Sequence, residues 1–144
     1  MPVGRMKNKS AQNIQSADLL NDKGYFDSSV HCSYYGCLQI VKLTICKIGK
    51  IDFGTQAIES RASEIGSHGY YLKTFKDIFK TDPKHKHDRK LNIDINKHVN
   101  DILKLKELRV EADYSPEHID PLKSTSAVST AKSFSQFMMD NFKL

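Results

Sequence analysis

The feature that most constrains this chain is a long stretch without proline, from Pro2 to Pro83, in which apolar residues recur at the spacing of a helix. Proline interrupts helix interiors because its nitrogen carries no N–H and its ring clashes with the preceding turn. Residues 27–48 carry the clearest apolar stripe, formed by Val30, Tyr34, Cys37, Leu38, Val41, Ile45 and Ile48. Tyr35 and Ile40 widen it, so we expect a central helix with neighbours on several sides.

The same periodicity predicts helices on both sides of this segment. We expect helices over about residues 10–22, 27–48, 68–80, 92–114 and 124–142. The apolar content of residues 56–65 is thin, so a further helix there is less clearly indicated. Strand-like alternation of apolar and polar residues is weak throughout. The pattern predicts an all-α fold, an antiparallel helical bundle of four main helices plus a short extra helix. Residues 1–9 are expected to be a flexible N-terminus and residues 10–144 a single domain.

Composition is typical of a globular protein, with 39% hydrophobic and 27% charged residues. The chain has 22 Lys and Arg against 17 Asp and Glu, a net charge of +5. That excess permits contact with RNA or DNA, but the basic stretches at residues 1–10 and 84–90 equally fit solvated segments. We identify neither a signal peptide nor a membrane helix, so we expect a cytoplasmic protein with no membrane partner. The three cysteines, an odd number within one predicted helix, are interpreted as reduced and buried.

Three short motifs lie on this helical pattern. Residues 10–42 contain a Leu-Leu pair, a Gly-Tyr turn and a Ser-Tyr-Tyr sequence; residues 67–79 form a helix led by His; residues 105–114 read LKELRVEADY. In this order they resemble the HEPN family (higher eukaryotes and prokaryotes nucleotide-binding domain), over about residues 10–141. The resemblance implies an antiparallel helical bundle that commonly dimerises. In many members it also implies metal-independent RNA cleavage, or a role in toxin–antitoxin and phage-defence systems.

The resemblance draws attention to Arg109. Active ribonucleases of the family carry an Arg, four to six intervening residues and then a His. Here Tyr114 follows Arg109 after four residues, and the next imidazole, His118, lies beyond the allowed spacing. The motif is incomplete, and whether the chain is an enzyme stays open. Asp113 lies one helical turn after Arg109, which favours an ion pair. Arg109 is then either half of a structural pair or an anion-binding group at a dimer cleft.

Other candidates also have two interpretations. His68 is either an ordinary residue at a helix start or a proton-transfer group brought near Arg109 by folding. Tyr34 and Tyr35 either pack in the core or stack on a base or nucleotide. His85 and His87 have no further ligand at metal-binding spacing, so we predict no metal site and no cofactor.

Two functional hypotheses follow. In the first, the chain is a HEPN-type component of a prokaryotic toxin–antitoxin or defence module that binds or cleaves RNA without metal at a homodimer cleft. Arg109 would engage phosphate, Asp113 and Tyr114 would support it, and His68 would be the candidate acid or base. In the second, it is a non-catalytic module that binds a nucleotide or a partner protein, such as a nucleotidyltransferase or antitoxin. The missing histidine favours the second hypothesis.

Overall fold

The computed structural model describes residues 2–144, and Met1 lies outside the described residues. The predicted all-α fold is confirmed, since this part of the chain contains six helices and no strand. They are α1 (Val3–Asp22), α2 (Phe26–Lys47), α3 (Phe53–Ala62), α4 (Gly66–Thr81), α5 (Arg89–Tyr114) and α6 (Pro121–Asn141). The expected four main helices plus one short helix do not match this count. The thin apolar content of α3 is offset by a cap, because the Asp52 carboxylate accepts the Thr55 N–H at 2.8 Å.

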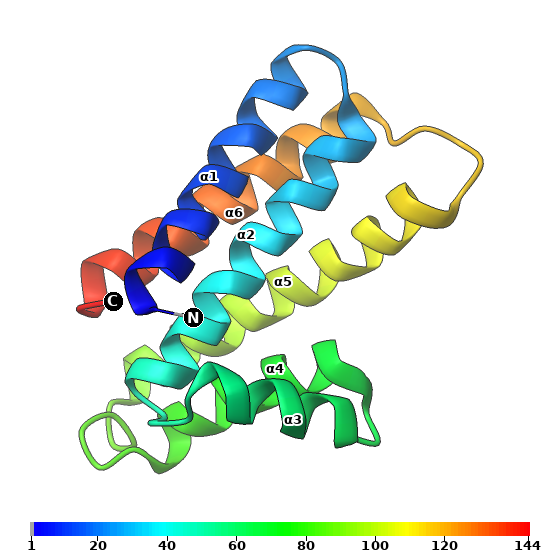
Figure 1. Ribbon diagram of the computed structural model, residues 1–144. Coiled ribbons are helices and arrows are strands. Elements are labelled where there is room, and N and C mark those ends of the chain that lie inside the picture. Colours follow the sequence, from blue (N-terminus) through cyan, green and yellow to red (C-terminus); the bar gives the residue numbers. More distant parts are fainter. Residues whose placement is uncertain (1) are drawn as a thin grey trace.

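Helices α1, α2, α5 and α6 run alongside one another, whereas α3 and α4 lie across one end of them (Figure 1). A short turn joins α1 to α2, and its Gly24 has a φ of 82°, a conformation that favours glycine. Helix α2 contacts each of the other five helices. The expectation of a central second helix is therefore confirmed.

The core surrounds α2. Large side chains from four different helices are fully buried there, among them Tyr34, Phe75, Ile102 and Phe134. Burial of one such apolar side chain contributes about 1.5–3 kcal/mol to folding. Helix α5, the longest, begins where the Asp88 carboxylate accepts the Leu91 N–H at 3.0 Å. The core thus fixes how α2, α4 and α5 lie against one another.

The first helix begins earlier than its expected start at residue 10. Residues 3–9 are helical instead of forming a flexible N-terminus. Met6 packs into the core with 7% of its surface exposed, and the Ser10 hydroxyl donates to the Gly36 carbonyl at 2.7 Å. One buried side chain in an otherwise polar segment gives no periodic pattern, so the sequence did not reveal this extension.

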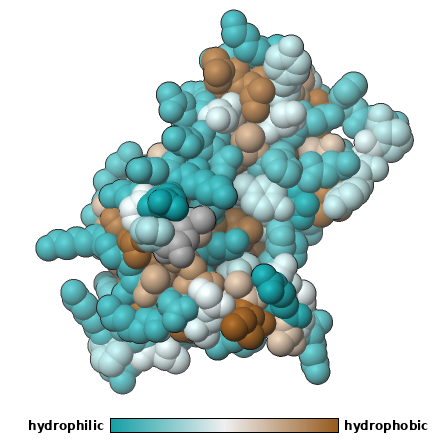
Figure 2. All heavy atoms as spheres, viewed as in Figure 1, coloured by the Kyte–Doolittle hydropathy of each residue, from teal (hydrophilic) through white to brown (hydrophobic). Residues whose placement is uncertain are grey.

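The surface in Figure 2 is largely hydrophilic, with smaller apolar patches between the polar side chains. Within residues 2–144, no helix is both long enough and apolar enough to cross a lipid bilayer.

Candidate functional site

A cluster of polar and aromatic side chains lies where α2, α4 and α5 meet. This Arg109 cluster consists of His31, Tyr34 and Tyr35 of α2, His68 of α4, and Arg109 and Asp113 of α5. The three α2 residues share one face of their helix, and so do the two α5 residues, because residues three and four apart are neighbours on a helix. Folding therefore brings together five of the six site residues that the sequence suggested.

Arg109 lies at the centre of the cluster. Its Cζ is 5.4 Å from the Tyr34 ring centroid and 5.8 Å from that of Tyr35. Its Nη1 donates to Asp113 Oδ2 at 3.2 Å, which confirms the predicted ion pair. Contacts between a cation and an aromatic face stabilise by about 0.5–2 kcal/mol each. The side chain is only 12% exposed, so its position is fixed.

The guanidinium of Arg109 retains unused donor capacity. Its Nε is buried and has no hydrogen-bond partner among the described residues. Leaving a buried donor unsatisfied costs about 1–3 kcal/mol. Burial disfavours the charge, but the hydrogen bond to Asp113 and the proximity of Tyr35 raise the pKa of Arg109 overall. The group is therefore a permanent cation whose buried Nε–H is unpaired among the described residues.

Asp113 also holds His31, a residue that the sequence did not suggest. His31 Nδ1 lies 3.2 Å from each carboxylate oxygen of Asp113. Its ring centroid is 4.7 Å from that of Tyr35. The spacing of His31 three and four residues before the two tyrosines was a usable signal for a shared face. Its pairing with Asp113, 82 residues away, was not visible in the sequence.

His68 lies on the other side of the tyrosines. Its Nδ1 is 2.7 Å from the Tyr34 hydroxyl, and the two rings are stacked with centroids 5.5 Å apart. Burial lowers the pKa of His68, and the charges of Arg109, Lys106 and Lys42 lower it further. The imidazole is thus a neutral group in positively charged surroundings. Such surroundings favour an anion as ligand.

Tyr114 does not belong to the cluster. Its side chain is on the surface, 76% exposed. Five positions after Arg109, it points about 140° away around a regular helix. His118, the next imidazole, instead pairs with Asp27, with Nδ1 and Oδ2 3.0 Å apart. Neither residue completes a site with Arg109 in this arrangement.

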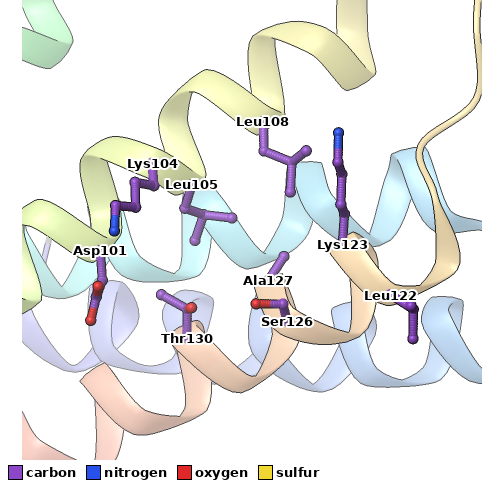
Figure 3. A pocket seen from close by; sticks show the side chains of 9 residues that line it. All are labelled: Asp101, Lys104, Leu105, Leu108, Leu122, Lys123, Ser126, Ala127 and Thr130. Atoms are coloured by element: carbon purple, nitrogen blue, oxygen red, sulfur yellow. The ribbon is translucent and has the colours of Figure 1, made fainter.

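A groove of about 460 Å³ lies on another face of α5, against α6 (Figure 3). Leu105, Leu108 and Ala127 line it, with Lys104 and Lys123 among its polar residues. It holds none of the cluster side chains.

Within the described part of the chain, no three His, Cys, Asp or Glu side chains gather in a way that would hold a metal ion. Cys37 is fully buried, and burial raises its pKa to about 12, so it is a protonated thiol at neutral pH.

Comparison with family models, with curated proteins and with solved structures gives no match to this chain.

Proposed function

We propose that this protein binds RNA at the Arg109 cluster and cleaves it without a metal ion, as a HEPN-like component of a prokaryotic toxin–antitoxin or phage-defence module. The observation that carries the proposal is the setting of Arg109. The guanidinium rests on Tyr34 and Tyr35 and is fixed by Asp113, which also binds His31, while a second imidazole, His68, contacts Tyr34. We place this activity in the cytoplasm.

The cluster combines groups suited to a phosphodiester. An arginine fork matches the geometry of phosphate oxygens and neutralises charge that develops during the reaction. Aromatic faces stack on bases with little sequence preference, and half-buried Tyr35 is the more accessible of the two tyrosines. An imidazole beside the phosphate would accept the proton of the 2′-hydroxyl. Cleavage of this kind leaves a 2′,3′-cyclic phosphate and a 5′-hydroxyl.

A homodimer is part of the proposal. Helix α5 carries a second apolar stripe on its solvent side, formed by Leu103, Val110 and Tyr114, each at least 41% exposed. Their spacings of seven and four residues place them on one face. These three residues lie about 100–140° around the helix from Arg109, so a second copy packed on this stripe would leave the cluster open to RNA. Such a dimer would carry two clusters related by its symmetry.

One observation favours a non-catalytic alternative. The charge of Arg109 is already balanced by Asp113, and its side chain is only 12% exposed. A paired, mostly buried arginine also fits a helical module that binds a nucleotide or a partner protein, such as a cognate nucleotidyltransferase or antitoxin.

The deciding experiment incubates the purified protein with mixed RNA in the presence of a chelator. We expect cleavage with cyclic phosphate ends, and we expect Arg109→Ala to lower the rate by about 100-fold or more, the scale of losing one electrostatic stabiliser. Exposed Arg61 on α3 provides the matched control, because Arg61→Ala removes the same charge away from the cluster.

Circular dichroism would establish that both variants fold. Binding of RNA without cleavage would favour the non-catalytic module. If the wild-type chain neither binds nor cleaves RNA, the proposal fails.

A further inference from the structure

His31 differs from the other members of the Arg109 cluster in its exposure. Its side chain is 47% exposed, whereas those of Arg109 and Asp113 are 12% and 25% exposed. It therefore stands at the rim of the cluster, where a ligand from solvent arrives first. A second imidazole, His68, lies deeper, between α2 and α4.

Asp113 determines which nitrogen of His31 is free. Both carboxylate oxygens lie 3.2 Å from Nδ1, so Nδ1 carries the proton and donates to them. In the neutral ring, Nε2 is then the basic nitrogen. Nε2 has no hydrogen-bond partner within residues 2–144. The carboxylate thus fixes the tautomer in which Nε2 is free to accept a proton.

Tyr35 fixes the plane of the same ring. The two ring centroids are 4.7 Å apart, with 38° between the planes. One edge of His31 is thus bound by Asp113 and one face is covered by Tyr35. An imidazole held in this way needs little reorganisation before it accepts a proton, which is an advantage for a general base.

The same carboxylate binds Arg109. Asp113 Oδ2 accepts from Arg109 Nη1 at 3.2 Å and lies 3.2 Å from His31 Nδ1. One side chain therefore sets the distance between a phosphate-binding cation and a base. His68 is less suited to this role, because its Nδ1 is occupied by the Tyr34 hydroxyl and its ring is partly buried.

From this arrangement we propose that His31 is the proton-transfer residue of the cluster and supplies the imidazole that the sequence after Arg109 lacks. The inference rests on the proposed RNA cleavage. His31 Nε2 takes the proton of a ribose 2′-hydroxyl while Arg109 holds the adjacent phosphate. The 2′-oxygen forms a bond to phosphorus, and the bond from phosphorus to the 5′-oxygen breaks. The 5′-oxygen takes a proton from water, and His31 returns its proton to the hydroxide that remains.

The test compares His31→Asn with the wild-type chain. Asn keeps a donor near the position of Nδ1, so it preserves the bond to Asp113 while it removes Nε2. We expect single-turnover cleavage to fall by about 100-fold or more, the usual contribution of a general base. Affinity for an RNA blocked by 2′-deoxy substitution should stay within about threefold. Exposed His87, in the loop before α5, provides the control His87→Asn, which should cleave like the wild type.

Chemical rescue separates proton transfer from structure. Because His31 is half exposed, added imidazole should enter the space that His31→Ala leaves and restore part of the cleavage. Arg109→Ala should show no such rescue, because imidazole cannot replace a guanidinium fork.

The outcomes distinguish this inference from the proposed function. If His31→Asn cleaves within about threefold of the wild type while Arg109→Ala does not cleave, the inference is overturned and the proposed function stands. Equal losses of binding and cleavage in His31→Asn would make His31 a binding residue and also overturn it. A wild-type chain that binds RNA without cleaving it overturns both the inference and the proposed cleavage and leaves only RNA binding. A chain that does neither removes the proposed function altogether.

Discussion

Burial decides the direction of the hydrogen bond between Tyr34 and His68. Tyr34 is fully buried, and burial raises the pKa of its hydroxyl above the usual range, although nearby Arg109 acts in the opposite direction. The hydroxyl therefore keeps its proton and donates it to His68 Nδ1. Neutral His68 then carries its own proton on Nε2. A charged His68 would be desolvated by burial and would face the cations of Arg109, Lys106 and Lys42, which is why its pKa is lowered.

This arrangement predicts that anion binding changes the titration of His68. Inorganic phosphate beside Arg109 would offset the surrounding positive charge, and the pKa of His68 should rise from its lowered value. An NMR titration of the imidazole with and without phosphate measures the change. The rise should vanish in Arg109→Ala; a pKa unaffected by phosphate in the wild type would show that no anion binds there.

The lowered pKa of His68 also makes the stability of the protein depend on pH. Its value in the folded chain lies below 6.5, so the unfolded chain binds the proton first as pH falls. The stability associated with neutral His68 is complete above pH 6.5 and is lost as pH falls through the lowered pKa.

At the scale of elements, α1 and α2 pack closely because small residues face each other. Ala17 is fully buried, and its carbonyl accepts the Ser29 hydroxyl at 2.6 Å. Gly36 lies opposite Ile14, where an added Cβ would be 2.6 Å from Ile14 Cγ1. The contact of α1 with α2 therefore depends on the close approach of the two backbones and on the hydrogen bonds of Ser10 and Ser29. Large apolar side chains of α1 contribute less to it.

We predict that Gly36→Ala destabilises the protein. The added methyl group would push Ile14 and α1 away from α2, at a cost of about 1–3 kcal/mol for overpacking. Urea unfolding measures this free energy. Gly4→Ala is the control, because a Cβ there meets nothing within 4 Å, and it should be neutral or slightly stabilising. Equal stability of Gly36→Ala and the wild type would contradict the close contact.

At the scale of the whole molecule, one carboxylate ties the start of α2 to the connection between α5 and α6. Asp27 Oδ1 accepts the Ile119 N–H at 2.8 Å, and Oδ2 lies 3.0 Å from His118 Nδ1. Ile119 is itself buried. This tie closes the end of the molecule at which α2 and α5 present His31 and Asp113.

Loss of the Asp27 carboxylate should change how the free energy of unfolding depends on pH. The Ile119 N–H lowers the pKa of Asp27 below 3.8, against the opposing effect of burial, and His118 lowers it further. The stability from the ionised carboxylate is therefore complete above that pH and is lost as pH falls through the lowered pKa. Asp27→Asn should lose about 1.5–3 kcal/mol at pH 7, the scale of a hydrogen bond to a charged group.

Urea unfolding at pH 7 and at pH 3 measures both effects. The difference between Asp27→Asn and the wild type should be large at pH 7 and smaller at pH 3. A difference that does not change with pH would assign the effect of the substitution to packing.

The sequence by itself determined the helices and the contacts within one helix. The stripe on α2 predicted a central helix, and the spacing of Arg109 and Asp113 predicted their ion pair, which the structure confirms. Both depend only on the helical period, which is local. The early start of α1 was missed and α3 was only weakly indicated, because they depend on one buried side chain and on one cap.

Only the tertiary structure decided which residues share a site. His31 meets Asp113 and Tyr34 meets His68 across 82 and 34 positions of sequence. Such meetings depend on how each helix is rotated against its neighbours, which the packing of the whole core sets. The exposure of Tyr114 did not need the tertiary structure, because the helical period alone turns it about 140° away from Arg109. The helical period fixes which residues share a face of a helix, and core packing fixes which faces meet.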